Sequence, residues 1–215
     1  MLALPLDWSR LQSVLCLGAH CDDIEIGCGG TIQWLREQNP ALRFHWMVAS
    51  ASDVREVETR AAAAAMLPSP AHVTLEFRRF RGSYLPQHWA EVKDCFEELK
   101  QSVQPDLILT HRLHDMHQDH KVIAELTWNT FRDHLILEYE IPKFEGDLGQ
   151  PNVYVPLPRE VAERKIELLM EHFSTQHARS WFRPEVFRGL MNLRAIECNA
   201  ASGYAEAFHA RKLVL

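Results

Sequence analysis

The sequence contains no apolar run close to the roughly 20 residues that a membrane-spanning helix requires. It also has no excess of basic residues, because 23 lysines and arginines stand against 29 aspartates and glutamates, for a formal net charge of −6. We therefore expect no membrane partner and no nucleic-acid partner. Residues 1–7 lack the basic start and long apolar segment of a secretory signal, so we expect no signal peptide there.

Cysteine is scarce and irregularly placed. The five cysteines are an odd number and no two have C-x-x-C spacing: they are Cys16, Cys21, Cys28, Cys95 and Cys198. This usage is typical of reduced thiols rather than of a disulfide framework, so we expect a cytoplasmic protein. The chain has 215 residues, of which 47% are hydrophobic, and this length predicts a single domain over residues 1–215 with a substantial core.

Short apolar segments alternate with segments of helical period along the chain. The apolar segments predict strands, and a mainly parallel α/β sheet follows from the alternation. The segment 153–156 contains a proline and is expected at a sheet edge. Predicted strands are 13–19, 43–50, 73–77, 107–110, 135–141, 153–156 and a terminal strand over 212–215, and predicted helices are 30–38, 54–65, 89–101, 121–126 and 159–173.

Ionisable side chains follow two of the predicted buried strands. The first strand leads into His20-Cys21-Asp22-Asp23, and the strand 107–110 leads into a loop rich in histidine and aspartate, residues 111–120. Ligands of open α/β sheets bind at the carboxyl ends of the strands. We therefore expect the two motifs to contribute to one site.

His20, Asp23 and His120 provide two imidazoles and one carboxylate. Three protein ligands with a fourth position open are typical of catalytic zinc, although Fe²⁺, Co²⁺ or Ni²⁺ would also fit these ligand types. A bound metal lowers the pKa of its water towards ~7 and polarises a carbonyl oxygen. The pattern predicts a metal site that activates water.

The neighbours of these ligands suggest catalytic roles. Asp22, beside Asp23, is free to act as a general base. His117 precedes His120 by three residues, so both can face one site. Asp119 is placed to hold the His117 imidazole in its charged form, which would make His117 an acid and an oxyanion stabiliser. The predicted catalytic residues are thus Asp22, His117 and Asp119.

Other residues near the motifs have simpler explanations. We do not expect His111 or His114 to be ligands, although both lie near the site in the sequence. Cys21 and Cys28 could provide thiolate ligands, but small residues in a tight loop are the simpler interpretation. The Gly27-x-Gly29-Gly30 turn could bind a phosphate, yet it is not the dinucleotide fingerprint.

These motifs resemble those of the PIG-L, or LmbE-like, deacetylase family. The family's AHPDD, GxGGT and HxDH patterns read here as residues 19–23, 27–31 and 117–120, and the similarity extends over essentially the whole chain. It implies a Rossmann-like, mainly parallel sheet with helices on both faces, a three-layer sandwich. It also implies a hydrolase that removes an N-acetyl group from an amino sugar, a linear amide.

The same resemblance assigns roles to individual residues. It implies zinc at His20, Asp23 and His120, with Asp22 as the base and His117 stabilising the tetrahedral intermediate.

Two positions depart from the family pattern. Cys21 replaces a proline, which should loosen the loop without removing a ligand. Asp115 stands where some members carry a tyrosine, so any acid role of that tyrosine must be supplied from elsewhere.

Several arginines are placed to bind an anionic substrate. Arg55 begins the helix after the second strand, and Arg78, Arg79 and Arg81 follow the third. Arginine binds phosphate or carboxylate through bidentate hydrogen bonds. We expect a small N-acetylated sugar or a conjugate with a nucleotide or other anionic group, with Arg55 as the substrate-binding residue. The oligomeric state, including a homo-oligomer, is left open.

Two alternative functions are weighed against this hypothesis. A metallohydrolase of the same fold acting on a phosphoester would need additional bridging carboxylates. A non-catalytic sugar- or nucleotide-binding module would have no need of Asp22 once Asp23 binds a metal. The intact aspartate pair therefore favours the deacetylase.

Overall fold

The computed structural model describes residues 7–67 and 72–214. In this part of the chain seven strands form one sheet in the order β3-β2-β1-β4-β5-β7-β6. The first five in that order are parallel, and β7 is antiparallel to β5 and β6. The predicted mainly parallel sheet is thus confirmed, with β6 at an edge. The strands are β1 (Ser13–His20), β2 (Arg43–Ser50), β3 (Val73–Phe77), β4 (Leu107–His111), β5 (Leu135–Tyr139), β6 (Val153–Pro156) and β7 (Ala205–His209).

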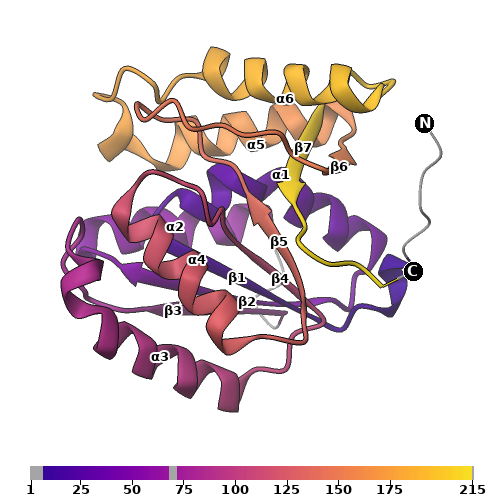
Figure 1. Cartoon of the computed structure of the whole chain (residues 1–215). Helices are drawn as coiled ribbons and strands as arrows, with labels where there is room; N and C mark the ends of the chain where they lie inside the picture. Colours follow the sequence, from indigo (N-terminus) through magenta and orange to yellow (C-terminus); the bar gives the residue numbers. More distant parts are fainter. Residues whose placement is uncertain (1–6, 68–71, 215) are drawn as a thin grey trace.

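Helices cover both faces of the sheet, so the three-layer sandwich is confirmed (Figure 1). Successive residues of β1 point to opposite layers, since Val14 and Cys16 join one core and Leu15 and Leu17 the other. No helix in the described ranges is long and apolar enough to cross a bilayer. One layer holds α1 (Asp23–Gln38), α2 (Asp53–Met66), α5 (Arg159–His172) and α6 (Pro184–Cys198), and the other holds α3 (Trp89–Ser102) and α4 (Gln118–Thr130).

Some predicted boundaries were wrong. Helix α1 begins at Asp23, the last residue of the motif, rather than at residue 30, and bends at Cys28, whose φ of −146° is not helical. Residues 212–214 form no strand, and Leu215 lies outside the described residues, as do the first six residues of the expected non-signal start. The last strand is β7, which inserts between β5 and β6. Neither β7 nor α6 was predicted from the sequence.

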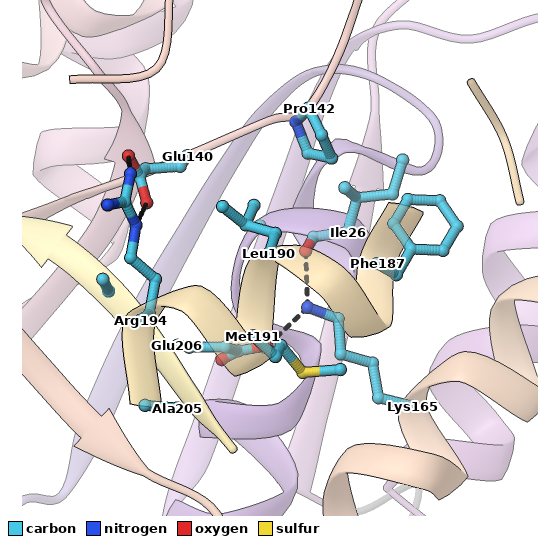
Figure 2. A pocket seen from close by; sticks show the side chains of 12 residues that line it. Ile26, Glu140, Pro142, Lys165, Phe187, Leu190, Met191, Arg194, Ala205 and Glu206 are labelled. Carbon is cyan, nitrogen blue, oxygen red and sulfur yellow. Dashed lines mark hydrogen bonds and ion pairs between the residues drawn. The ribbon is translucent and has the colours of Figure 1, made fainter. Parts of the chain in front are cut away.

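Two ion pairs are buried where α5, α6 and β7 meet (Figure 2). The Nζ atom of Lys165 lies 2.6 Å from Oε1 of Glu206 and donates to the carbonyl of Ile26. Arg194 makes a bidentate pair with Glu140, at 2.8 and 2.7 Å. The cavity between them is about 20 Å³, room for one water, so it is part of the packing rather than a ligand site.

The glycine turn of α1 serves close packing. A Cβ atom on Gly27 would lie 2.2 Å from the ring of Tyr139 on β5. The backbone amides of Gly30 and Thr31 donate to the carboxylate of Glu206, at 2.9 and 2.7 Å. An internal carboxylate therefore occupies the amides that a phosphate would need, and the phosphate-binding alternative loses its support.

Candidate metal centre and active-site cleft

The strand order brings the two sequence motifs together. β1 pairs with β4, while the helices that follow them, α1 and α4, cover opposite faces of the sheet. Such a reversal opens a crevice at the carboxyl ends of the two strands. His20 ends β1 and His111 ends β4, so both motifs meet at this crevice.

Ligand atoms of His20, Asp23 and His120 converge there. The Nδ1 atom of His20 lies 3.5 Å from Oδ2 of Asp23, and Nε2 of His120 lies 3.5 Å from Oδ1 of the same carboxylate. Two overlapping sets of potential ligands share His120, one with His20 and His117 and the other with Asp23 and His111. Neither set contains all three predicted ligands, because His20 belongs to the first set and Asp23 to the second.

Each of the two predicted histidine ligands contacts a further carboxylate through the ring nitrogen that does not lie near Asp23. Nε2 of His20 lies 3.0 Å from Oδ2 of Asp119, and Nδ1 of His120 lies 2.9 Å from Oδ2 of Asp115. The other nitrogen of each ring is thereby left towards Asp23. Histidines that bind metals are commonly oriented in this way. Two imidazoles and one carboxylate in this arrangement fit a divalent metal ion.

The predicted partner of Asp119 was wrong. Its carboxylate contacts His20 and accepts hydrogen bonds from the backbone amides of Ser83 and Leu85 rather than bonding the His117 ring. His117 instead caps α4, where its Nδ1 atom accepts from the backbone N–H of Asp119 at 3.2 Å. This bond places the proton on Nε2. Burial and the neighbouring His20 lower the pKa of His117, so its neutral form is favoured.

Asp22 adopts a backbone conformation that is rare for a side chain, with φ of +103°. Such strain is characteristic of functional sites. Its Oδ1 atom lies 2.8 Å from Nη2 of Arg55, which also donates to the carbonyl of Cys21. Burial raises the pKa of Asp22 to about 7, although Arg55 opposes this shift. The charge of Arg55 is thus compensated within the protein.

His111 has a larger part in the site than the sequence suggested. Its side chain is fully buried, with Nε2 3.1 Å from Oδ2 of Asp23 and 3.0 Å from the amide nitrogen of Ala19. Burial would raise the pKa of Asp23, but His120 and His111 outweigh it and hold that pKa well below its usual range. His111 does not line the cleft, so it contacts the Asp23 carboxylate from the side buried in the protein.

The site opens into a cleft of about 460 Å³. One wall comes from the two motifs, Arg55 and the turn after β3. The other wall was not predicted, because it comes from the β5–β6 connection (residues 140–152) and the α5–α6 connection (residues 173–183), which carry no periodic pattern. Its side chains are Ile141, Lys143, Phe144, Glu145, Gln176, Arg179 and Trp181.

The cationic side chains of the cleft differ in their partners. Arg55 and Lys143 are paired with carboxylates, whereas Arg179 has no ion-pair partner among the described residues. The other predicted arginines do not line the cleft: Arg78 and Arg79 pair with glutamates, and Arg81 stacks on Tyr84.

Solved structures share this fold at low sequence identity. N,N'-diacetylchitobiose deacetylase from Pyrococcus horikoshii is 19% identical with a TM-score of 0.73, over 94% of this chain and 85% of that chain. GalB, the 4-carboxy-2-hydroxymuconate hydratase of Pseudomonas putida, is 17% identical with a TM-score of 0.73, over 95% and 98%. The zinc-inhibited form of the teicoplanin deacetylase Orf2 is 14% identical with a TM-score of 0.71, over 93% and 97%.

At the level of sequence, no curated protein matches the chain. A family model does match, and it is described as PIG-L, GlcNAc-PI de-N-acetylase. The match covers residues 15–131, more than half of the chain, and includes both motifs of the crevice. The chain therefore belongs to the PIG-L family.

Proposed function

We propose that this protein is a metal-dependent N-deacetylase that hydrolyses the acetamide group of an amino sugar or sugar conjugate, with Zn²⁺ as the expected metal. The observation that carries the proposal is the arrangement of Asp22. It lies in the cleft next to three converging ligands, His20, Asp23 and His120, but is itself held by Arg55. A carboxylate in that position suits a general base.

Similarity of fold is not the basis of this proposal. The similar structures include both deacetylases and a hydratase, so the same architecture accompanies more than one reaction. Membership of the PIG-L family favours the deacetylase, and so does the residue set in the cleft.

The residues of the cleft suggest how hydrolysis would proceed. When bound, a divalent metal ion supplies a water of lowered pKa and polarises the acyl oxygen. Asp22 accepts the proton of the attacking water at Oδ2, because Arg55 holds Oδ1. That proton passes to the amine nitrogen as the C–N bond breaks, giving acetate and a free amino sugar.

His117 is the proposed oxyanion stabiliser. Its Nδ1 atom is occupied by the amide of Asp119, so Nε2–H is the group available to the cleft. A neutral imidazole can donate this hydrogen bond to the acyl oxygen as negative charge develops there. No charged form of His117 is needed, in contrast to the expectation from the sequence.

The second wall of the cleft suggests the acceptor. Phe144 and Trp181 offer aromatic surfaces, and 71% of the Phe144 residue surface is exposed. Arg179 supplies a cation that has no ion-pair partner among residues 7–67 and 72–214, while Arg55 serves mainly to hold Asp22. We therefore assign recognition of an anionic group, such as the diphosphate of a nucleotide-linked sugar, to Arg179 rather than to Arg55.

Acetate release tests the function directly. The purified protein, loaded with Zn²⁺, is incubated in parallel with N-acetylglucosamine, a nucleotide-linked N-acetyl sugar and a chitin oligomer. We expect acetate from the nucleotide-linked sugar at the highest kcat/KM, and release slower by about 10²–10⁴ from the Asp22→Asn variant. Arg179→Gln should lower kcat/KM for the anionic substrate alone, by about tenfold or more.

Two results would contradict parts of the proposal. Turnover of the oligomer alone, with Arg179→Gln unaffected, would contradict the proposal that the acceptor carries an anionic group. Absence of acetate release from every N-acetyl sugar, with a metal bound, would contradict the proposed deacetylase function.

A further inference from the structure

A buried lysine belongs to the second wall of the cleft. The side chain of Lys143 is 7% exposed, and its Nζ atom lies 3.0 Å from Oδ2 of Asp115 and 2.7 Å from Oδ1 of Asp147. A buried cation is costly unless it is paired, and these two carboxylates satisfy it. Lys143 therefore holds a defined position between the motif loop 111–120 and its own segment.

Asp115 connects this lysine to both histidines of the second motif. The oxygen that contacts Lys143, Oδ2, also bonds Nδ1 of His120 at 2.9 Å. Its other oxygen, Oδ1, accepts from the backbone amide of His117 at 2.8 Å. The carboxylate that orients a predicted metal ligand is thus itself held by a residue from a different part of the chain.

Lys143 also anchors residues that face the substrate space. Its neighbours Phe144 and Glu145 line the cleft. Asp147 fixes the far end of this turn, since its carboxylate accepts from the amide of Met116 and its carbonyl from Arg112, each at 2.6 Å. One side chain therefore ties the acceptor wall of the cleft to the orientation of His120.

The chain contains a second buried lysine for comparison. Lys165 is 4% exposed and pairs with Glu206 at 2.6 Å, in the small cavity beneath α6 (Figure 2). Within the described residues, its bonding partners are Glu206 and the carbonyl of Ile26, and neither side chain forms a hydrogen bond or ion pair with the predicted metal ligands. Both lysines contribute to packing, but of the two only Lys143 contacts a residue, Asp115, that bonds a predicted metal ligand.

We infer that Lys143 is a positioning residue that couples the two parts of the site. It holds Asp115 against His120, and it places Phe144 and Glu145 on the cleft wall. Loss of this side chain should therefore weaken metal binding and substrate binding together. The substrate half of this inference rests on the proposed deacetylase function, while the metal half does not.

Metal affinity is measured first, without substrate. The Zn²⁺ affinity of each variant is determined by competition with a chromogenic chelator, and thermal melting reports folding. We expect Lys143→Met to weaken Zn²⁺ binding by about tenfold, the lower end of the range for loss of a direct partner of a metal ligand, because Lys143 acts on His120 through Asp115. Lys143→Arg should restore most of the affinity, and Lys143→Gln, which keeps one donor, should be intermediate and provides a milder change for folding.

Two further variants separate positioning from packing. Lys165→Met should lower the melting temperature without changing the Zn²⁺ affinity of the folded protein. Asp147→Asn keeps the Lys143–Asp115 pair but loosens the turn, so it should raise KM for an N-acetyl sugar conjugate and leave Zn²⁺ affinity within about twofold of wild type.

The inference is overturned if folded Lys143→Met and Lys143→Gln bind Zn²⁺ as wild type does, or if Lys165→Met weakens binding equally. Absence of acetate release from all substrates would instead count against the proposed function, because the chelator competition requires no turnover.

Discussion

The Nε2 atom of His20 lies 3.0 Å from Oδ2 of Asp119, a residue 99 positions further along the chain. The same carboxylate accepts from the amides of Ser83 and Leu85, in the segment between β3 and α3. The orientation of one predicted metal ligand therefore depends on three separate parts of the sequence. Asp119 acts on the metal site through His20, not on the charge of His117.

Removal of this carboxylate should weaken metal binding. In Asp119→Ala, His20 loses the partner that fixes its ring, and we expect Zn²⁺ affinity to fall by about 10–100-fold. Chelator competition measures the change. Asp94→Ala, at an exposed position on α3, is the control and should bind Zn²⁺ as wild type does. An unchanged affinity in Asp119→Ala would show that His20 needs no outer carboxylate.

Substitution of a metal ligand should change the amount of bound zinc, whereas substitution of the general base should not. His20→Ala, Asp23→Ala and His120→Ala each remove a donor atom and should lose most bound zinc. Asp22→Asn should keep it, because Asp22 is held by Arg55 rather than by the ligand set. Elemental analysis of the purified variants checks this expectation. Full zinc occupancy in His120→Ala would exclude that residue and leave His111 as the alternative nitrogen near Asp23.

Kinetics should distinguish the base from the oxyanion donor. Asp22→Asn retains the shape of the side chain but cannot accept a proton, so kcat should fall by about 10²–10⁴. His117→Ala removes the Nε2–H donor and should lower kcat by about 10²–10³. Rates of acetate release at saturating substrate give both values. A His117→Ala enzyme with wild-type kcat would end the proposed role of this residue.

The glycine turn gives a stability prediction. In Gly27→Ala the new Cβ atom would meet the Tyr139 ring at 2.2 Å, and that ring is fixed by a hydrogen bond from its hydroxyl to the carbonyl of Leu17. Overpacking of this kind should cost about 1–3 kcal/mol in the free energy of unfolding. Urea denaturation measures it. Gly189→Ala on α6 meets no atom within 4 Å and should be neutral or slightly stabilising.

His209 should make stability depend on pH. Burial, aided by Arg112, Arg194 and His114, lowers the pKa of His209 to about 4. Between this value and the ordinary pKa near 6.5, the unfolded chain binds a proton that the folded protein does not, so stability falls as pH decreases. Melting temperatures at pH 7.5 and 5 test this. The drop between them should be smaller in His209→Gln than in wild type; an equal drop would contradict the assignment.

Much of the site was predictable because its signals are local. An apolar run predicts a strand wherever it packs, and the motifs directly after β1 and β4 bring their ligands to the ends of those strands. The sequence therefore predicts His20, Asp23 and His120 as candidate ligands, and the alternation of strands and helices predicts the parallel sheet. Asp22 was recognised as the base candidate from its position beside Asp23 alone.

The partners of individual side chains depend on how the elements pack in the fold. Arg55 was expected to bind substrate, but packing of α2 places its guanidinium against Asp22. Asp119 was expected to bond the His117 ring, but its carboxylate instead bonds His20 and the amides of Ser83 and Leu85. A residue's neighbours in sequence do not specify which of several carboxylates its ring will meet, because that depends on where other elements pack.

The second wall of the cleft shows the same limit. Lys143 and Arg179 lie in connections without helical or strand period, so their sequence carries no sign of where they fold. Each lies at the cleft because of where its flanking elements pack in the fold: β5 and β6 for Lys143, and α5 and α6 for Arg179. The local sequence alone specifies which ionisable groups lie at the ends of β1 and β4. Their surroundings depend on the packing of the whole fold, since burial and pairing involve segments far apart in the chain.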